Sequence, residues 1–183
     1  MTVSAADVAA ELRRRLPGLA VKKQHKLLYY CQGHHVAAFG EPLFAETISA
    51  WDMGPVVGQL WHEEREGTAA IFGTPLTEAQ LNTIGYVISR YGGLTGSDLE
   101  RLTHAEPPWQ EANKARLPKD TAKITVESLR TYFASAAASD AEDDAPLPDA
   151  DVVAEWLGQV SGPPGEPGTR DTVESLRARV TSA

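Results

Sequence analysis

The sequence predicts a mainly α-helical, compact domain with a short two-stranded extended element, followed by an acidic tail that contains proline and glycine. Apolar residues recur at the three- and four-residue spacing of amphipathic helices through most of residues 1–138. Only residues 43–51 and 123–125 have the β-branched and aromatic residues typical of strands. Residues 139–151 are acidic and nearly free of large apolar residues, which is typical of a linker. We therefore expect a helical domain over residues 1–138 and a tail over residues 139–183.

Composition and charge exclude several classes of protein. The chain has 183 residues, of which 42% are hydrophobic and 23% charged, enough to bury a core. No apolar run approaches the roughly 20 residues that cross a bilayer, and the N-terminal residues lack a signal-peptide pattern, so we expect a cytoplasmic protein without membrane contact. Residues 1–138 have 14 Lys+Arg against 15 Asp+Glu, and residues 139–183 have 3 against 10. This balance disfavours nucleic-acid binding, which relies on basic surfaces.

The first two helices are well marked. Ser4 is a suitable N-cap for a helix over Ala5–Leu16, which Pro17-Gly18 ends. A second helix is expected over Val21–Phe39, and its apolar residues cover most of its circumference, so it should be the central helix. Gly33 lies in its middle and costs roughly 1 kcal/mol relative to alanine. We expect this glycine to admit a neighbouring backbone or a large ring.

The next segment predicts an extended piece and a turn. Residues 43–51 alternate roughly between apolar and polar positions and should form a strand or extended arm. Residues 52–55, with the sequence Asp-Met-Gly-Pro, should form the turn that follows it. Proline suits the first turn of a helix, so we place Pro55 at the start of a helix over Val56–Glu66.

Capping and periodicity predict the remaining elements. Thr77 and Gln80 have the spacing of a capping box that opens a helix through Tyr91. Another helix should start near Ser97 and end before Pro107-Pro108, which force a corner. The expected later elements are one or two turns over Gln110–Arg116, a short strand over Lys123–Thr125 that pairs near Ile48, and a core helix over Val126–Ala137. In the tail, Asp151–Gln159 and Arg170–Val180 are short amphipathic segments suited to docking.

Few residues suggest chemistry. Cys31 and His35 are spaced to share one helix face, and His34 and His104 could complete a metal site or a thiol-based catalytic site. However, a thiol within an apolar helix face has a raised pKa and is inert. Glu63, Glu64 and Glu66 have the pattern of a solvated helix face. No phosphate-binding loop, nucleophile elbow or pair of carboxylates in an apolar run is present, so the sequence favours neither an enzyme nor a metal or cofactor.

Several separate motifs resemble one known family. They are Lys26–Tyr30 with the sequence KLLYY, Pro42–Phe44 with PLF, Ala50–Val57 with AWDMGPVV, and Thr103–Trp109 with THAEPPW. Their order and sequence are similar to those of the Panacea domain, also called the SocA-like or GepA-like antitoxin domain. The resemblance extends over about Ala5–Ala137 and leaves out Ser139–Ala183.

This resemblance implies a helical antitoxin of a two-gene toxin–antitoxin system, a class associated with phage defence. Such an antitoxin binds and neutralises a protein toxin encoded by a neighbouring gene, and it can also deliver the toxin to a ClpXP-type protease. The resemblance implies no enzyme. The alternative from the residues alone is a metal- or thiol-dependent enzyme that uses Cys31, His34, His35 and His104.

A family that meets diverse toxins should keep its scaffold and vary its contact surface. We therefore expect the motif residues to build the domain: Lys26, Leu27, Tyr30, His34, Trp51, Gly54, Pro55, His104 and Trp109. Toxin contacts are expected from residues 43–51, residues 61–73 and the tail. The candidate contact residues are Phe44, Ile48, Trp51, Met53, Trp61 and Trp156, because aromatic side chains are common in interface hot spots.

Overall fold

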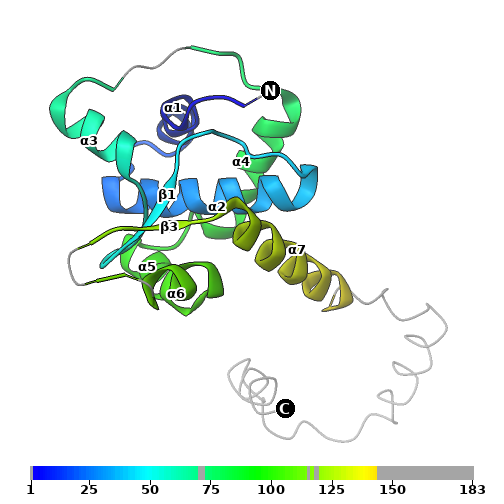
Figure 1. Ribbon diagram of the computed structural model, residues 1–183. Helices are drawn as coiled ribbons and strands as arrows, with labels where there is room; N and C mark the ends of the chain where they lie inside the picture. Colours follow the sequence, from blue (N-terminus) through cyan, green and yellow to red (C-terminus); the bar gives the residue numbers. More distant parts are fainter. Residues whose placement is uncertain (1, 70–72, 115, 118–119, 144–183) are drawn as a thin grey trace, which may run out of the picture. The chain divides into compact units, whose positions relative to one another are not determined.

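The computed structural model describes residues 2–69, 73–114, 116–117 and 120–143. The helices and strands of this part are α1 (Ala5–Arg15), α2 (Val21–Phe39), β1 (Ile48–Trp51), β2 (Gly54–Val57), α3 (Gly58–Glu66), α4 (Glu78–Tyr91), α5 (Gly96–Ala105), α6 (Pro107–Lys114), β3 (Ala122–Ile124) and α7 (Val126–Asp143). The mainly helical fold class is confirmed (Figure 1). None of the helices in these ranges is long and apolar enough to cross a membrane. The expected amphipathic segments of the tail, and Trp156, lie outside the described residues.

Helix α2 is the centre of the domain, as its sequence pattern predicted. It packs against α1, α4, α5, α7 and β2, and in Figure 1 it crosses the middle of the domain. Its buried residues include polar side chains as well as apolar ones, among them Gln24, His25, Lys26, Gln32 and His35. A buried polar group is costly unless it is hydrogen-bonded. The partners of these side chains therefore define how the other elements are placed.

Gly33 admits a ring, as expected. A Cβ atom added at Gly33 would lie 2.2 Å from Cε2 of Phe133, which comes from α7. Phe133 also meets the ring of Tyr29 edge to face, with centroids 5.6 Å apart. The missing side chain at Gly33 thus lets α7 approach α2 closely over an aromatic cluster.

The sheet has three strands rather than two. It is antiparallel, in the order β2-β1-β3, and the expected pairing of the third strand with Ile48 is confirmed by the register Ile48↔Ile124. The placement of Pro55 at the start of a helix was wrong. Pro55 pairs with Ala50 in β2, and α3 begins at Gly58. Proline is compatible with a strand at the edge of a sheet, where its missing N–H removes no ladder hydrogen bond.

Residues 43–47, which precede β1, do not form part of a strand. The side chain of Gln32 binds the backbone of the first two of them. The amides of Leu43 and Phe44 donate to Oε1 of Gln32 at 2.9 and 3.2 Å, and Nε2 of Gln32 donates to the carbonyl oxygen of Phe44 at 3.0 Å. Val3 forms an isolated bridge to Phe44. The strand expected over residues 43–51 is therefore limited to Ile48–Trp51.

Helix ends follow the expected caps, with small differences in length. Ser4 caps α1, and Thr77 and Gln80 form the capping box of α4. The turns expected from Gln110 begin earlier, at Pro107, because proline is compatible with the first turn of a helix. Helix α7 continues to Asp143, beyond the expected end at Ala137. No proline lies between Val126 and Asp143, so nothing in this segment of the sequence ends the helix at Ala137.

Replacing Gly33 with alanine is expected to destabilise the domain by about 1–3 kcal/mol, the usual cost of overpacking. This loss should outweigh the helix propensity of alanine, which favours it by about 1 kcal/mol. Chemical denaturation of the Gly33→Ala variant measures the change.

Gly85, in the middle of α4, provides the matched control. An added methyl group there meets only the flexible guanidinium of Arg15, at 3.3 Å. Gly85→Ala should keep the stability or raise it by up to about 1 kcal/mol. Equal effects of the two substitutions would contradict the role assigned to Phe133.

Candidate functional site

An open groove of about 690 Å³ lies beside the first turns of α2. Its other walls are the hairpin of β1 and β2, helix α3, and the residues Arg116, Asp120 and Thr121. Three of the six candidate contact residues line this groove, namely Trp51, Met53 and Trp61. Exposed hollows lined by aromatic and polar side chains are the usual place for a binding site.

The apolar wall of the groove is a cluster of rings. Trp51 and Trp61 meet edge to face with centroids 5.4 Å apart, and the ring of His62 lies 5.0 Å from that of Trp61. Arg65 lies over the ring of Trp61 at 5.3 Å. Met53, at the tip of the hairpin, is 56% exposed. Such a group of half-buried aromatic side chains beside an exposed methionine is typical of a protein contact surface.

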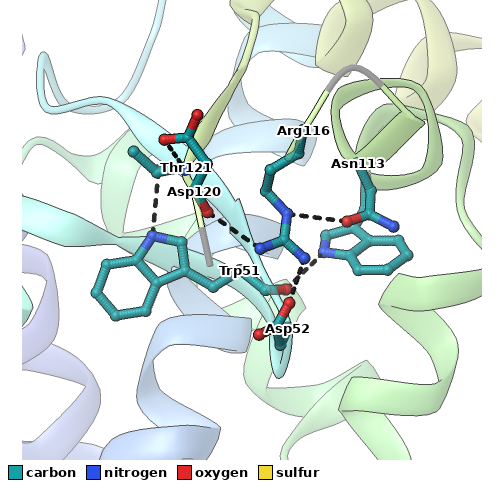
Figure 2. A network of polar contacts seen from close by, with 7 residues as sticks. Trp51, Asp52, Asn113, Arg116, Asp120 and Thr121 are labelled. Carbon is teal, nitrogen blue, oxygen red and sulfur yellow. Dashed lines mark hydrogen bonds and ion pairs between the residues drawn. The ribbon is translucent and has the colours of Figure 1, made fainter. Parts of the chain in front are cut away.

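Arg116 braces the hairpin (Figure 2). Its Nε donates to Oδ1 of Asn113 at 3.0 Å, and Nη1 donates to the carbonyl oxygen of Asp120 at 3.0 Å. Its Nη2 forms an ion pair with Asp52 in the turn of the hairpin. The Arg116 side chain is only 9% exposed. Because one buried guanidinium joins α6, the segment before β3 and the hairpin turn, the groove wall is fixed from behind.

The two tryptophans of the sequence motifs meet at the hairpin. Nε1 of Trp109 donates to the carbonyl oxygen of Trp51 at 3.3 Å, and Nε1 of Trp51 donates to Oγ1 of Thr121 at 3.3 Å. His104 stacks on Trp109 with ring centroids 3.9 Å apart. These contacts place two motifs that are distant in sequence side by side.

Two buried polar side chains form the floor of the groove. Lys26 is 1% exposed, and its Nζ donates to the carbonyl oxygen of Pro55 at 3.1 Å. Burial lowers the pKa of Lys26 to about 8, although Glu100 opposes this change. His25 is 2% exposed and burial lowers its pKa to about 4, so it is neutral at pH 7.

The hydrogen bonds of His25 define its tautomer. The amide of Val57 donates to Nδ1 of His25 at 3.3 Å, so the proton of the neutral ring is assigned to Nε2. Nε2 of His25 is buried and has no hydrogen-bond partner among the described residues. His25 therefore has a buried donor that none of the described residues satisfies.

Gly54 lets the hairpin close over Lys26. It has a φ of +97°, and an added Cβ would lie 2.7 Å from Cε of Lys26 and 3.1 Å from Oγ1 of Thr103. A side chain is therefore excluded both by backbone strain and by contact. Lys26, Gly54 and Thr103 come from three separate motifs and meet at this point.

Glu106 is a buried carboxylate that the sequence analysis missed. It is 9% exposed, and its two oxygens accept hydrogen bonds from the hydroxyl groups of Tyr29 at 2.6 Å and Tyr30 at 2.9 Å. Burial raises the pKa of Glu106 to about 7, and the two tyrosine hydrogen bonds oppose this change. The two adjacent tyrosines of KLLYY indicate hydroxyl groups that need a hydrogen-bond partner. The sequence does not show that this partner lies 76 positions after Tyr30.

The four residues of the alternative catalytic site lie in different surroundings. Cys31 is fully buried, and burial raises the pKa of its thiol. Nδ1 of His35 lies 2.9 Å from Oγ1 of Thr83, and Nε2 of His34 lies 3.1 Å from the hydroxyl oxygen of Tyr91. The ring of His104 stacks on Trp109, and its buried Nε2 has no hydrogen-bond partner among the described residues. Within the described ranges, no three His, Cys, Asp or Glu side chains are grouped as metal ligands.

The candidate contact residues differ in burial. Phe44 and Ile48 are 0% and 2% exposed, so a partner has no access to them in this conformation. Trp51, Met53 and Trp61 line the groove. The motif residues Leu27 and Tyr30 are fully buried in the core. Glu64 is less exposed to solvent than expected, because it accepts hydrogen bonds from the side chains of Arg13 at 2.7 Å and Gln24 at 3.0 Å.

These features define a helical domain with a braced hairpin and an open groove beside α2. Residues 25–110 match the family described as antitoxin SocA-like, Panacea domain. The match confirms the resemblance over a shorter range than residues 5–137. Comparison with curated proteins and with solved structures returned no match. The matched segment contains every motif residue discussed above, whereas α1, β3, α7 and Arg116 lie outside it.

Glu106 is expected to make stability depend on pH. Its pKa is about 7 in the folded state against 4.5 ordinarily, so the folded state binds the proton more tightly. The resulting stabilisation is complete below pH 4.5 and is lost as the pH rises through 7. It amounts to about 3 kcal/mol, at 1.36 kcal/mol per pKa unit. Tyr29, Tyr30, Tyr91 and Tyr132 also have raised pKa values and stay protonated in this range.

The variant Glu106→Gln keeps an acceptor for one tyrosine hydroxyl and removes the titration. Urea denaturation of both proteins between pH 4.5 and 8 should show the gap in unfolding free energy moving in favour of the variant as the pH rises. A gap that stays constant across this range would contradict the assignment.

Proposed function

We propose that this protein is the antitoxin of a two-gene toxin–antitoxin system and neutralises a protein toxin by binding it directly. The family match carries the proposal, because SocA-like Panacea domains are antitoxin domains. The same match favours a binding protein over an enzyme. The groove beside α2 offers a contact surface of the required kind, and its rim residues Trp51, Met53 and Trp61 lie within the matched segment.

The proposed contact surface is the groove with its rim, centred on Trp51, Met53 and Trp61. Its aromatic rings are partly exposed, and Arg116 holds the hairpin in place behind them. A preorganised surface loses little conformational entropy on binding. Phe44 and Ile48 are left out of this surface because they are buried. The motif residues of the core act as the scaffold in this proposal.

The acidic tail is a second proposed contribution. Residues 139–183 have 3 Lys+Arg against 10 Asp+Glu, so they would complement a basic toxin surface and speed association. We place the protein in the cytoplasm with its toxin. Delivery of the toxin to a ClpXP-type protease is compatible with the same contact surface.

The substitution Met53→Glu is expected to abolish neutralisation. A carboxylate at the tip of the hairpin would be desolvated against the toxin, which costs several kcal/mol at an interface. The measurement is growth of cells that co-express the product of the adjacent gene, together with isothermal titration calorimetry of the purified pair. Toxin abundance during rescue separates blocking, with an unchanged level, from proteolytic delivery, with a reduced level.

Leu102→Glu is the matched control, since Leu102 is 43% exposed on α5 and does not line the groove. This variant should rescue growth like the unmodified protein. Absence of any complex between the unmodified protein and the adjacent gene product would overturn the proposed function. Equal rescue by both variants would move the contact surface elsewhere.

The enzyme alternative makes an opposite prediction for Cys31 and His35. If neutralisation relies on binding, the double variant Cys31→Ala/His35→Asn should keep full rescue wherever it folds, because neither side chain lies at the groove. Growth rescue and a thermal unfolding curve of the variant measure this. A folded variant that no longer rescues would favour the enzyme.

A further inference from the structure

A partner can reach the rim of the groove beside α2 but not its base. Lys26 and His25 at the base are buried, so neither is available to a ligand. The apolar side chains that line the groove, by contrast, are exposed or half-buried. This apolar rim consists of Val21, Trp51, Met53 and Trp61. A partner segment that occupies the groove therefore needs apolar side chains of its own.

The accessible charges along the groove are mainly negative. Asp52 forms an ion pair with Arg116, yet the Asp52 side chain is 71% exposed, whereas the guanidinium is buried behind it. Asp120 is exposed, and within the described ranges no cationic side chain forms an ion pair with its carboxylate. Lys22, which also lines the groove, is already paired with Glu100. The groove therefore presents open carboxylates beside its apolar rim.

The two carboxylates belong to one edge of the groove. Arg116 contacts both residues, Asp52 through its carboxylate and Asp120 through its carbonyl oxygen at 3.0 Å (Figure 2). We call this pair of residues the acidic edge. Helix α3, on another wall, contributes Arg65 together with three glutamates, so it does not reverse the sign of the charge.

This charge restricts the kind of occupant. A nucleic-acid backbone would place phosphates against the acidic edge, which is unfavourable. A second copy of this chain has a net charge of −8, and residues 139–183 have 10 Asp+Glu against 3 Lys+Arg, so neither is complementary to the edge. A basic segment of another protein is complementary in sign.

We propose that the groove binds a segment of the toxin in which a lysine or arginine lies between apolar residues, so that the apolar side chains pack against the apolar rim and the cation pairs with the carboxylates of Asp120 and Asp52. This inference rests on the proposed function and gives its contact a defined chemistry. The methylene stem of a lysine or arginine covers apolar surface while its charged end stays at the edge. Because the edge is open to solvent, the cation keeps part of its hydration and the pair avoids the cost of full burial.

The test is the association rate of the full chain with the purified product of the adjacent gene, followed by the fluorescence of the groove tryptophans in a stopped-flow instrument. The variant Asp120→Lys replaces attraction by repulsion, so the rate constant should fall about 10-fold at low ionic strength. The loss should nearly disappear at about 1 M salt, where the Debye length is about 3 Å. The brace should remain, because Arg116 uses the carbonyl oxygen of Asp120 and not its side chain.

Glu41→Lys is the matched control, since it changes the net charge of the chain by the same amount. Glu41 is exposed and follows the C-cap of α2, whereas the groove lies beside the first turns of this helix. The 19 residues of α2 span about 28 Å, at 1.5 Å per residue. This distance exceeds the Debye length of about 8 Å at physiological salt, so Glu41→Lys should change the rate less than about 2-fold there.

Two further variants complete the test. If Asp120→Lys lowers the melting temperature, Asp120→Asn replaces it, because the asparagine oxygen can still accept from the amide of Thr121. Replacement of each Lys and Arg of the toxin by Glu should find one residue whose loss of binding is restored by Asp120→Lys. Such a charge swap identifies the toxin cation that meets the acidic edge.

The possible outcomes are distinct. A salt-dependent loss for Asp120→Lys alone, restored by one charge swap, supports the inference. Equal rates for Asp120→Lys and Glu41→Lys, faster association of Asp120→Lys, or no restoring swap overturn it while the complex and the proposed function stand. A dimer of the unmodified chain that Met53→Glu dissociates would assign the groove to a second copy and also overturn it. Absence of a complex with the unmodified chain overturns the proposed function, and this inference with it.

Discussion

The hydrogen bond from the buried ammonium of Lys26 to the carbonyl oxygen of Pro55 is the interaction on which the arrangement of the domain depends. It joins the central helix α2 to the hairpin, and the close approach needs a glycine at position 54. Oγ1 of Thr103, from α5, lies at the same place, 3.1 Å from the position that a Cβ of Gly54 would take. Three motifs that are separated by tens of residues thus serve one geometric requirement. The hairpin and α5 therefore pack around the ammonium group of Lys26, which α2 places in the core.

Much of the fold was predictable because local rules agreed with the tertiary structure. The periodicity of residues 21–39 gave the bounds of α2, and the capping box of Thr77 and Gln80 gave the start of α4. Gly33 marked a close contact before the contacting ring was known. Residues 54–57 were misassigned because Gly-Pro-Val-Val suits the start of a helix as well as an edge strand. Only the pairing with β1 decides between the two, and this pairing is not a local property.

The site was less predictable, because it is made of contacts between distant segments. Trp51, Met53 and Trp61 could be selected from residue type, but the groove between them depends on Arg116 and residues 120–121. Phe44 and Ile48 have the same residue chemistry and are buried, which sequence alone does not distinguish. Glu106 precedes a proline pair and looks like an ordinary helix-end carboxylate. Its unusual environment comes from Tyr29 and Tyr30 on another helix.

The side chain of Gln32 has a consequence for the N-terminal end of the chain. By binding the backbone of Leu43 and Phe44, it provides a surface for residues near the start of the chain. The amide of Val3 then donates to the carbonyl oxygen of Leu43, and the amide of Ala5 donates to Glu46. The residues ahead of α1 are therefore joined to α2 through residues 43–46, while α1 itself also packs directly on α2 and α4. Loss of the Gln32 side chain would release the N-terminal end of the chain as well as the two residues that it binds.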